Sequence, residues 1–344
     1  MRKKNLIAIF LIVFTMMLSS FAFYAYQIIY TPNVLVEEKA MEVAVPHGMS
    51  FQELQSILTK ERIVNDAVSF GFLSKLKGLD TSLKPGMYLL EPNMTNLQLI
   101  NLLRSGSQTP VNLTFSNARL LPELSKKLTQ NLEIDSAQMA KILLGDSTAL
   151  KYGFEQHTFI GMFIPNTYSV YWTSSPREIL DRIKYEYTSF WSEERLSKAK
   201  KLNLTPIEVS TLASIVDAET NRMDEAATVA GVYINRLQRG IALQADPTLV
   251  YALGDFSIRR ILNKDKLLDS PYNTYKYRGL PPGPINMPSI AAIEAVLNYE
   301  EHNYLYFCAN EDFSGYHIFA KTLSEHNRNA RKFQRALNRE RIYR

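Results

Sequence analysis

Residues 205–220, Thr-Pro-Ile-Glu-Val-Ser-Thr-Leu-Ala-Ser-Ile-Val-Asp-Ala-Glu-Thr, are the stretch around which this chain is organised. Thr at the N-cap, Pro at the first helical position and Glu at the third predict a well-capped helix start. Leu212, Ile215 and Val216 then form an apolar stripe at helical spacing. Glu219 follows these residues by seven, four and three positions, so its carboxylate is expected on the stripe that faces the domain interior.

The position of Glu219 suggests a general acid. A carboxyl group on an apolar face loses solvation, which raises its pKa toward the range useful for acid catalysis near neutral pH. Asp217 is displaced by about 200° around the helix axis, so we expect it to face away and not to pair with Glu219. The plain structural alternative is a helix-end Glu that binds an arginine or backbone amides of the next segment.

The N-terminus reads as a membrane anchor. Residues 6–26 contain no charge and suffice to cross a hydrocarbon core of roughly 30 Å. Arg2, Lys3 and Lys4 precede them and predict a cytoplasmic N-terminus with the rest of the chain on the outer face. A cleaved signal peptide is the alternative, but the apolar run exceeds the usual length of about 7–15 residues. We therefore expect a single-pass protein of the inner (cytoplasmic) membrane, with a tail at 1–5 and a transmembrane helix at 6–29.

The remainder predicts an α+β protein with two folded parts after a linker at 30–41. Residues 42–110 read as strand, helix, helix, strand and a further helix, with a capping box at Ser50 and Glu53. This order resembles the LysM-like module that binds glycans. Residues 111–344 form the larger catalytic part, in which strands and helices do not alternate as βαβ units, so a doubly wound sheet is not expected.

Composition limits the chemistry. Hydrophobic residues make up 46% of the chain and charged residues 21%, so the chain has enough apolar material for stable cores. Cys308 is the single cysteine, which rules out an intramolecular disulfide and is expected to be an inert strand residue. The five histidines lack zinc-type spacing. The sequence therefore predicts no metal and no cofactor.

The C-terminal segment is strongly basic. Apolar residues recur at helical spacing between positions 327 and 343, and Arg328, Arg331, Arg341 and Arg344 are among its cations. The favoured interpretation is a surface helix with a solvated basic face. Contact with anionic lipid headgroups or an anionic polymer is the alternative. Nucleic acid is disfavoured, because the anchor places the folded parts outside the cytoplasm.

Seven blocks of sequence follow one another in a fixed order. They are LASIVDAET at 212–220, VAGVYINRL at 229–237, LQADPT at 243–248, YNTY at 272–275, GLPPGPI at 279–285, GYHIF at 315–319 and EHN at 325–327. Together with the N-terminal layout they resemble the endolytic murein transglycosylase family (MltG, YceG-like) over essentially the whole chain. The family's catalytic glutamate directly precedes a Thr, so the resemblance implies Glu219. Asp217 stands where the family usually has a second Glu.

The resemblance implies a lyase that cuts the glycosidic bond between N-acetylmuramic acid (MurNAc) and N-acetylglucosamine (GlcNAc) in nascent peptidoglycan. One Glu suffices for this reaction, because the sugar's own 6-hydroxyl attacks the anomeric carbon and leaves a 1,6-anhydro-MurNAc end. A hydrolase normally needs two carboxylates. Cutting inside strands near the membrane would limit strand elongation, and peptidoglycan synthases are the expected partners besides the glycan and the inner membrane.

Substrate-binding residues are expected in the same blocks. Amides and hydroxyls suit N-acetyl groups and the charge of the transition state, although each can equally serve as a loop cap. His317 can bond the catalytic Glu or a sugar hydroxyl, or can be a core histidine, and Asp246 is a turn acid or a second polar group. The Leu-Pro-Pro-Gly loop is expected to be a rigid groove wall. The full set is Asn235, Gln244, Asp246, Thr248, Tyr272, Asn273, Thr274, Tyr275, Leu280, Pro281, Pro282, Gly283 and His317.

Two other functions remain open at this stage. The first is a lysozyme-like hydrolase in which Asp246 is the second carboxylate. The second is a non-catalytic, membrane-tethered glycan-binding protein. An anhydro product is lighter than the hydrolytic product by one water, which distinguishes the transglycosylase from the hydrolase. Glycan binding without turnover would support the non-catalytic protein.

Overall fold

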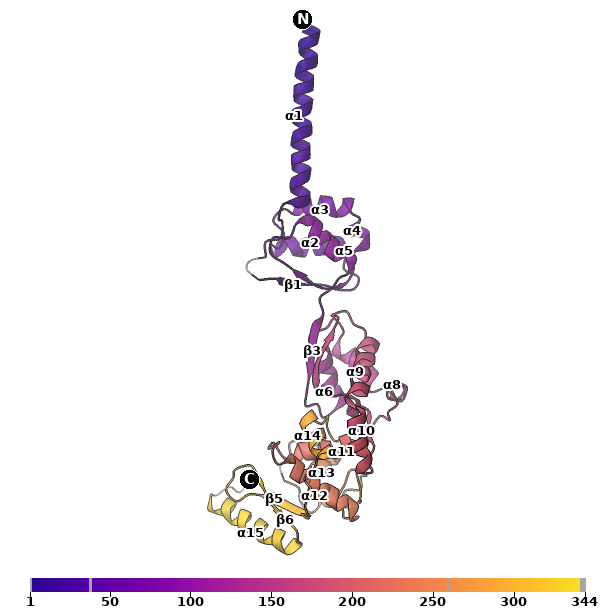
Figure 1. Ribbon diagram of the computed structural model, residues 1–344, viewed down its shortest axis with the longest axis vertical. Coiled ribbons are helices and arrows are strands. Elements are labelled where there is room, and N and C mark those ends of the chain that lie inside the picture. The colour runs from indigo at the N-terminus through magenta and orange to yellow at the C-terminus, as the bar shows by residue number, and fades with distance from the viewer. Residues whose placement is uncertain (1, 37–38, 259, 341–344) are drawn as a thin grey trace. The chain divides into compact units, whose positions relative to one another are not determined.

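The chain is a mixed α+β protein with an N-terminal apolar helix, as the computed structural model shows (Figure 1). The structure describes residues 2–36, 39–258 and 260–340. The chain divides into two compact units. Unit 1 comprises Met1–Leu113, Asn131–Ile134 and Ser169–Ser175, and unit 2 comprises Thr114–Gln130, Asp135–Tyr168 and Pro176–Arg344.

Helix α1 (Arg2–Tyr30) carries the apolar N-terminal segment. Residues Lys3–Tyr30 have a mean hydropathy of 2.5 in their most apolar window and are long enough to cross a membrane. A helix at this place is also typical of a signal sequence. The last turn of the helix packs into unit 1, because Ile28 is buried and its carbonyl accepts a hydrogen bond of 2.9 Å from the Asn96 amide.

The segment expected to be a linker is packed where the structure describes it. Asn33 and Val34 are buried, and the amide of Asn33 donates to Asn96 at 2.6 Å. Val34 bridges to Val64 in antiparallel fashion. Asn33 and Val34 therefore belong to the core of unit 1, because a buried amide network holds them there. Residues 37 and 38 lie outside the described part.

Unit 1 follows the predicted order of strands and helices. Strands β1 (Met41–Val45) and β2 (Gly86–Leu90) pair antiparallel, with Met41 opposite Leu90. The elements between and after them are α2 (Phe51–Lys60), α3 (Ala67–Leu76), α4 (Leu79–Ser82) and α5 (Asn96–Ser105). The predicted capping box at Ser50 and Glu53 is confirmed. The sequence did not indicate the short α4, which begins after Gly78 in the left-handed region at φ 70°.

The strands of the larger region form separate pairs. Strands β3 (Val111–Phe115) and β4 (Asn166–Val170) form one two-stranded sheet, and β5 (Tyr306–Ala309) and β6 (His317–Ala320) form another. The helices of this region are α6 (Leu121–Thr129), α7 (Ser136–Leu143), α8 (Asp146–Lys151), α9 (Pro176–Phe190), α10 (Glu193–Lys201), α11 (Pro206–Glu219), α12 (Ala226–Gln238), α13 (Asp246–Leu253), α14 (Ile290–Leu297) and α15 (Leu323–Arg339). Short 3-10 turns lie at Phe159–Met162 and Asp265–Leu267.

Helix α11 is the centre of the unit 2 core. Its predicted capping box at Thr205 and Glu208 is confirmed. Every residue from Val209 to Val216 is buried, so this part of the helix is enclosed on all sides rather than along one stripe. Helices α12, α13 and α14 pack around it. A fully enclosed helix has little freedom to shift, so the residue at its end is held in a fixed place.

Helix α15 carries the basic C-terminal segment. It packs against β5 and β6, and Ala336 is buried in that contact. The side chains of Arg328, Arg331 and Lys332 are exposed, as the surface-helix interpretation expects. Arg341 and Arg344 lie outside the described residues.

Candidate active site

Glu219 is the last residue of α11, and its carboxylate is partly buried. The hydroxyl of Tyr233, on α12, donates a hydrogen bond of 2.7 Å to its Oε1. Burial raises the pKa of Glu219 to about 7, against the opposing effect of the Tyr233 hydrogen bond. The negative charge of Asp246 adds to the increase. Glu219 can therefore hold a proton near neutral pH and also release it, which a general acid and base requires.

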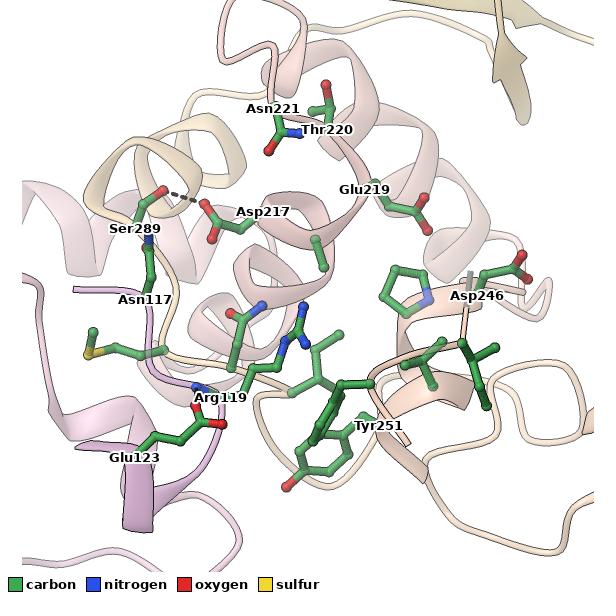
Figure 2. A pocket seen from close by; sticks show the side chains of 18 of the residues that line it. Asn117, Arg119, Glu123, Asp217, Glu219, Thr220, Asn221, Asp246, Tyr251 and Ser289 are labelled. Carbon is green, nitrogen blue, oxygen red and sulfur yellow. Dashed lines mark hydrogen bonds between the residues drawn. The ribbon is translucent and has the colours of Figure 1, made fainter. Parts of the chain in front are cut away.

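Two cavities meet at Glu219. The larger has a volume of about 930 Å³, and Glu219, Asp217 and Asp246 are among its lining residues (Figure 2). The smaller has a volume of about 680 Å³ and is lined by Glu219 and Asp246 together with Tyr275 and His317. Glu219 and Asp246 are shared by both linings. A bound chain could thus extend on both sides of the carboxylate, as a polymer substrate would require.

Asp246 is exposed at the first turn of α13, after Ala245. It accepts a short hydrogen bond from the hydroxyl of Tyr275. Burial and this hydrogen bond both raise the pKa of Tyr275, so the phenol stays protonated as a donor. Asp246 therefore lies at a helix start and also borders both cavities.

Tyr233 is a site residue that sequence reasoning missed. Burial raises the pKa of its phenol well above the usual value, so the hydroxyl remains a donor to Glu219. Its ring packs edge-on against Phe307 of β5 at 5.8 Å between centroids. The available signal was weak: Tyr233 lies in the block at 229–237, but nothing in its spacing indicates that its hydroxyl reaches α11.

Arg236 was also missed. Its Nε donates to the carbonyl of Leu305 at 2.6 Å, and its Nη1 donates to the carbonyl of Leu243 at 2.8 Å. The guanidinium also lies over the ring of Tyr306, 5.0 Å from the centroid. Arg236 therefore joins the loop before α13 to the start of β5, and Arg236, Leu243 and Tyr306 border the smaller cavity.

Glu225, a buried carboxylate, holds His317 in place. Its Oε1 is 2.6 Å from Nδ1 of His317, and its Oε2 accepts a hydrogen bond of 2.9 Å from the backbone N–H of the same residue. The hydroxyl of Thr220 donates to Oε1 at 2.8 Å. The carboxylate bonded to His317 is thus Glu225 and not Glu219. In the neutral ring this leaves Nε2 as an acceptor, and His317 borders the smaller cavity.

Several predicted site residues support the cavity walls from behind. The amide of Asn235 donates to the carbonyls of His302 and Tyr304, and that of Asn273 donates to Lys266 and Leu268. The buried hydroxyls of Thr248 and Thr274 bond each other at 2.8 Å, and Tyr272 packs on Tyr251. In the part of the chain that the structure describes, these five residues lie outside both linings. Gln244 does border the smaller cavity. Its backbone is in the left-handed region, with φ at 53°.

The Leu-Pro-Pro-Gly loop at 280–283 packs into the protein. A Cβ on Gly283 would come within 2.3 Å of the carbonyl oxygen of His157, so glycine is needed there for a close approach of backbone to backbone. Among the described residues, Leu280, Pro281, Pro282 and Gly283 do not line either cavity. The wall of the larger cavity is formed by the next segment, with Ile285, Asn286, Met287 and Ser289.

Asp217 is closer to the site than its helical position predicted. It is turned away from Glu219 around α11, but its side chain also lines the larger cavity (Figure 2). Ser289 donates its hydroxyl to Oδ1 at 2.5 Å, and burial raises the pKa of Asp217. The expected displacement of Asp217 from Glu219 around the helix agrees with this position. The sequence did not indicate that the 285–289 segment extends the cavity around the helix end to Asp217.

Two further observations concern metal-ligating and thiol side chains. No three His, Cys, Asp or Glu side chains are grouped to hold a metal ion within residues 2–36, 39–258 and 260–340. Cys308 is half-buried on β5, and burial raises the pKa of its thiol. A thiol with a raised pKa is a weak nucleophile at neutral pH. Glu219, which borders both cavities and whose pKa is raised to about 7, is the candidate for acid–base chemistry.

Residues 43–332, which include both cavities and Glu219, match the sequence model of the YceG-like family. The chain belongs to that family. It is 30% identical over 310 residues to the endolytic murein transglycosylase of Bacillus subtilis, a match that covers 85% of this chain and 84% of the relative. The endolytic murein transglycosylase of Streptococcus pneumoniae, strain D39, is 29% identical over 352 residues; this match covers 92% of this chain and 63% of the relative.

The fold has a counterpart in a crystal structure of a YceG-like protein from Listeria monocytogenes. The TM-score is 0.56 at 29% sequence identity. The comparison covers 85% of this chain and 99% of the other. The similarity therefore extends over most of both chains rather than being limited to one part.

Proposed function

We propose that this chain is an endolytic peptidoglycan lytic transglycosylase with Glu219 as its single general acid and base. The observation that carries the proposal is the carboxylate itself, whose pKa burial raises to about 7 and which lies where two cavities meet. The relatives from Bacillus subtilis and Streptococcus pneumoniae, named endolytic murein transglycosylases, support the same substrate.

In the first step, protonated Glu219 donates its proton to the oxygen that links C1 of MurNAc to C4 of GlcNAc. The C1–O bond breaks and the anomeric carbon takes on oxocarbenium character. The carboxylate left behind is stabilised by the Tyr233 hydroxyl. The negative charge of Asp246 nearby favours the developing positive charge on the sugar.

In the second step, the 6-hydroxyl of the same MurNAc attacks C1. Glu219, now a carboxylate, takes the hydroxyl proton and returns to its starting state. The product is a 1,6-anhydro-MurNAc end, and no water is consumed. One carboxylate performs both proton transfers. The reaction therefore does not require a second carboxyl group at the distance that separates the two carboxyl groups of a hydrolase.

The linings of the two cavities suggest how the strand is held. Gln244, Tyr275 and His317 offer amide, phenol and imidazole groups along the smaller cavity, where sugar hydroxyls and N-acetyl groups can bond them. The residues behind the walls, Asn235 and Asn273 among them, act by holding the loops in position. Because the carboxylate is open on both sides, cleavage inside a strand is supported over removal of end units.

The setting proposed for this activity is the outer face of the inner membrane. Helix α1 would be a retained anchor with a cytoplasmic N-terminus, and the strand–helix–helix–strand part of unit 1 a LysM-like glycan-binding module. Held close to newly made strands beside peptidoglycan synthases, the enzyme would limit strand elongation. A reporter fused after Arg344 should be active only if it is a type that works outside that membrane, and cytoplasmic activity would refute the topology.

A hydrolase is the second candidate, because Asp246 shares both linings with Glu219. Product mass decides between the two. The full-length chain in detergent, given purified peptidoglycan, should release fragments lighter than the hydrolytic products by one water, and Glu219→Gln should release none. Fragments of hydrolytic mass would overturn the transglycosylase mechanism in favour of Asp246 as base or nucleophile. Strand binding without any cleavage by the unaltered protein would instead indicate a glycan-binding protein.

A further inference from the structure

The larger cavity contains one cationic side chain among its described lining residues, Arg119. Its side chain is exposed and extends from the loop before α6 toward the middle of the cavity (Figure 2). The guanidinium lies over the ring of Phe256, 4.8 Å from the centroid. Such stacking restrains the plane of the guanidinium while leaving its N–H groups free to donate.

The loop that carries Arg119 is fixed on both sides. Asn117 adopts the left-handed conformation at φ 50°. The buried Ala118 accepts a hydrogen bond of 2.8 Å from the backbone N–H of Met287, in the segment that forms the cavity wall. The backbone N–H of Arg119 donates to Glu123 Oε2 at 2.9 Å. Arg119 is therefore presented by a preorganised turn, which lowers the entropic cost of binding through its side chain.

None of the ion pairs found among the described residues joins Arg119 to an acid of this cavity. Each of them accepts a hydrogen bond from another group: Glu123 from the Arg119 backbone, Asp217 from Ser289, Asp246 from Tyr275 and Glu219 from Tyr233. The guanidinium thus keeps its donors for an anion that enters the cavity. The same acids would repel such an anion, so a cation there is required for it to bind.

We propose that Arg119, held by Phe256, is a carboxylate-binding subsite for the peptide stem that MurNAc carries. This inference rests on the proposed function. In a peptide-bearing strand the lactyl carboxyl of MurNAc is an amide, so the free carboxylates are those of the stem peptide, away from the sugar ring. An amidase removes these and leaves a carboxylate on the lactyl group, close to the ring. A planar guanidinium binds a carboxylate in bidentate fashion with well-defined geometry. The subsite gives the enzyme a preference for strands that bear peptides over strands from which an amidase has removed them.

The test compares peptide-bearing strands with amidase-treated strands of the same length, using the full-length protein. The readout is the ratio of kcat/KM between the two substrates. A charge-assisted hydrogen bond contributes about 1.5–3 kcal/mol, so Arg119→Gln should reduce the ratio by about tenfold or more. Arg119→Lys should recover only part of it, because an ammonium cannot bind in bidentate fashion. Arg331→Gln, an exposed arginine on α15, is the matched control and should keep the wild-type ratio.

Two outcomes overturn the subsite. One is a wild-type protein that cuts both strands equally, and the other is an Arg119→Gln protein that retains the wild-type ratio. In both cases the proposed function stands. Failure of the wild type to cut either strand would instead sink the proposed function. The subsite is then tested by binding alone, with a muramoyl disaccharide–peptide and its peptide-free disaccharide. Binding to the Glu219→Gln protein should favour the peptide form, and adding Arg119→Gln should remove that preference; equal binding of both ligands would refute it.

Discussion

The hydroxyl of Tyr233 on α12 donates to the carboxylate of Glu219 at the end of α11, at 2.7 Å. This contact belongs to a closed series. Tyr233 packs on Phe307, Phe307 packs on His317 at 5.0 Å, His317 bonds Glu225, and Glu225 accepts from Thr220, the residue after Glu219. The catalytic candidate is therefore held through its side chain and through its neighbour in the chain. Such support fixes a reactive group more precisely than a single contact would.

Tyr233→Phe should shift the pH dependence of cleavage upward. The Tyr233 hydrogen bond lowers the pKa of Glu219, so its loss lets burial raise that pKa further above about 7. Because the first step needs protonated Glu219, the rate of the wild type should fall as pH rises through about 7. The falling limb should move to higher pH in the variant, and kcat should drop about tenfold as the carboxylate loses its donor. Measurement of kcat between pH 5 and pH 9 checks both effects.

If kcat of Tyr233→Phe fell at the same pH as kcat of the wild type, the role assigned to this hydrogen bond would be contradicted. Tyr185→Phe is a suitable control, since Tyr185 is exposed on α9. Tyr185→Phe should leave both the pH at which kcat falls and the value of kcat as in the wild type. A comparable loss in the control would point to a general effect on the fold.

Glu219→Gln should make the folded protein more stable at alkaline pH. The folded-state pKa of Glu219, about 7, lies above the unfolded value of 4.5, so between these values the native state binds a proton that the unfolded chain lacks. The wild type therefore loses stability as pH rises from about 4.5 to about 7, by an amount on the order of 3 kcal/mol. The amide has no such dependence.

Thermal unfolding at pH 5 and pH 8 measures this difference. The gain in Tm of Glu219→Gln over the wild type should be larger at pH 8 than at pH 5. An equal gain at both pH values would mean that Glu219 is not destabilised by burial of its charge. The trade of stability for a reactive carboxyl group is a general property of catalytic sites.

The start of α11 and the burial of Glu219 could be predicted from sequence, because a capping box and apolar periodicity are local patterns. The partners of Glu219 could not. Tyr233 and Glu225 come from the next helix and loop, and their side chains reach the site only through packing around α11. The enclosure of α11 on all sides was missed for the same reason, since periodicity reports one buried face and not the number of neighbours.

The residues predicted to line the substrate groove fall into two groups, those that border a cavity and those that stabilise loops. Gln244 and Tyr275 border a cavity, whereas Asn273 and Thr274 stabilise loops, although all are polar residues beside turns in the sequence. Composition cannot distinguish a side chain that faces a cavity from one that bonds a carbonyl. Gly283 shows the limit most clearly, because its loop was expected to form a groove wall, whereas its backbone packs against the backbone of His157.

Asp246→Asn and Asp217→Asn should have unequal effects. Asp246 borders both cavities and its charge raises the pKa of Glu219, so its loss should lower that pKa and reduce kcat near pH 7 by about three- to tenfold. Asp217 bonds Ser289, and an amide oxygen can accept the same hydrogen bond, so its replacement should change kcat less than about threefold. Kinetics of the two purified variants at pH 6 and pH 7.5 check the order. A greater loss from Asp217→Asn would mean that this carboxylate takes part in the reaction.

Glu225→Gln should reduce kcat more than it changes KM for short strands. The carboxylate accepts from Thr220 and from the backbone and ring nitrogens of His317, whereas the amide has one acceptor oxygen and presents N–H groups to donors on its other side. The mismatch should release His317 and loosen the backbone after Glu219, so the catalytic geometry is affected while the cavity walls that bind sugars remain. We expect kcat to fall about 10- to 100-fold, as for other residues that orient a reactive group.

Glu300→Gln is the matched control, because Glu300 is an exposed carboxylate that accepts a hydrogen bond from Thr228, and it should be close to wild type. If Glu225→Gln raised KM and spared kcat, His317 and Glu225 would be binding the strand directly, and the positioning role would be refuted.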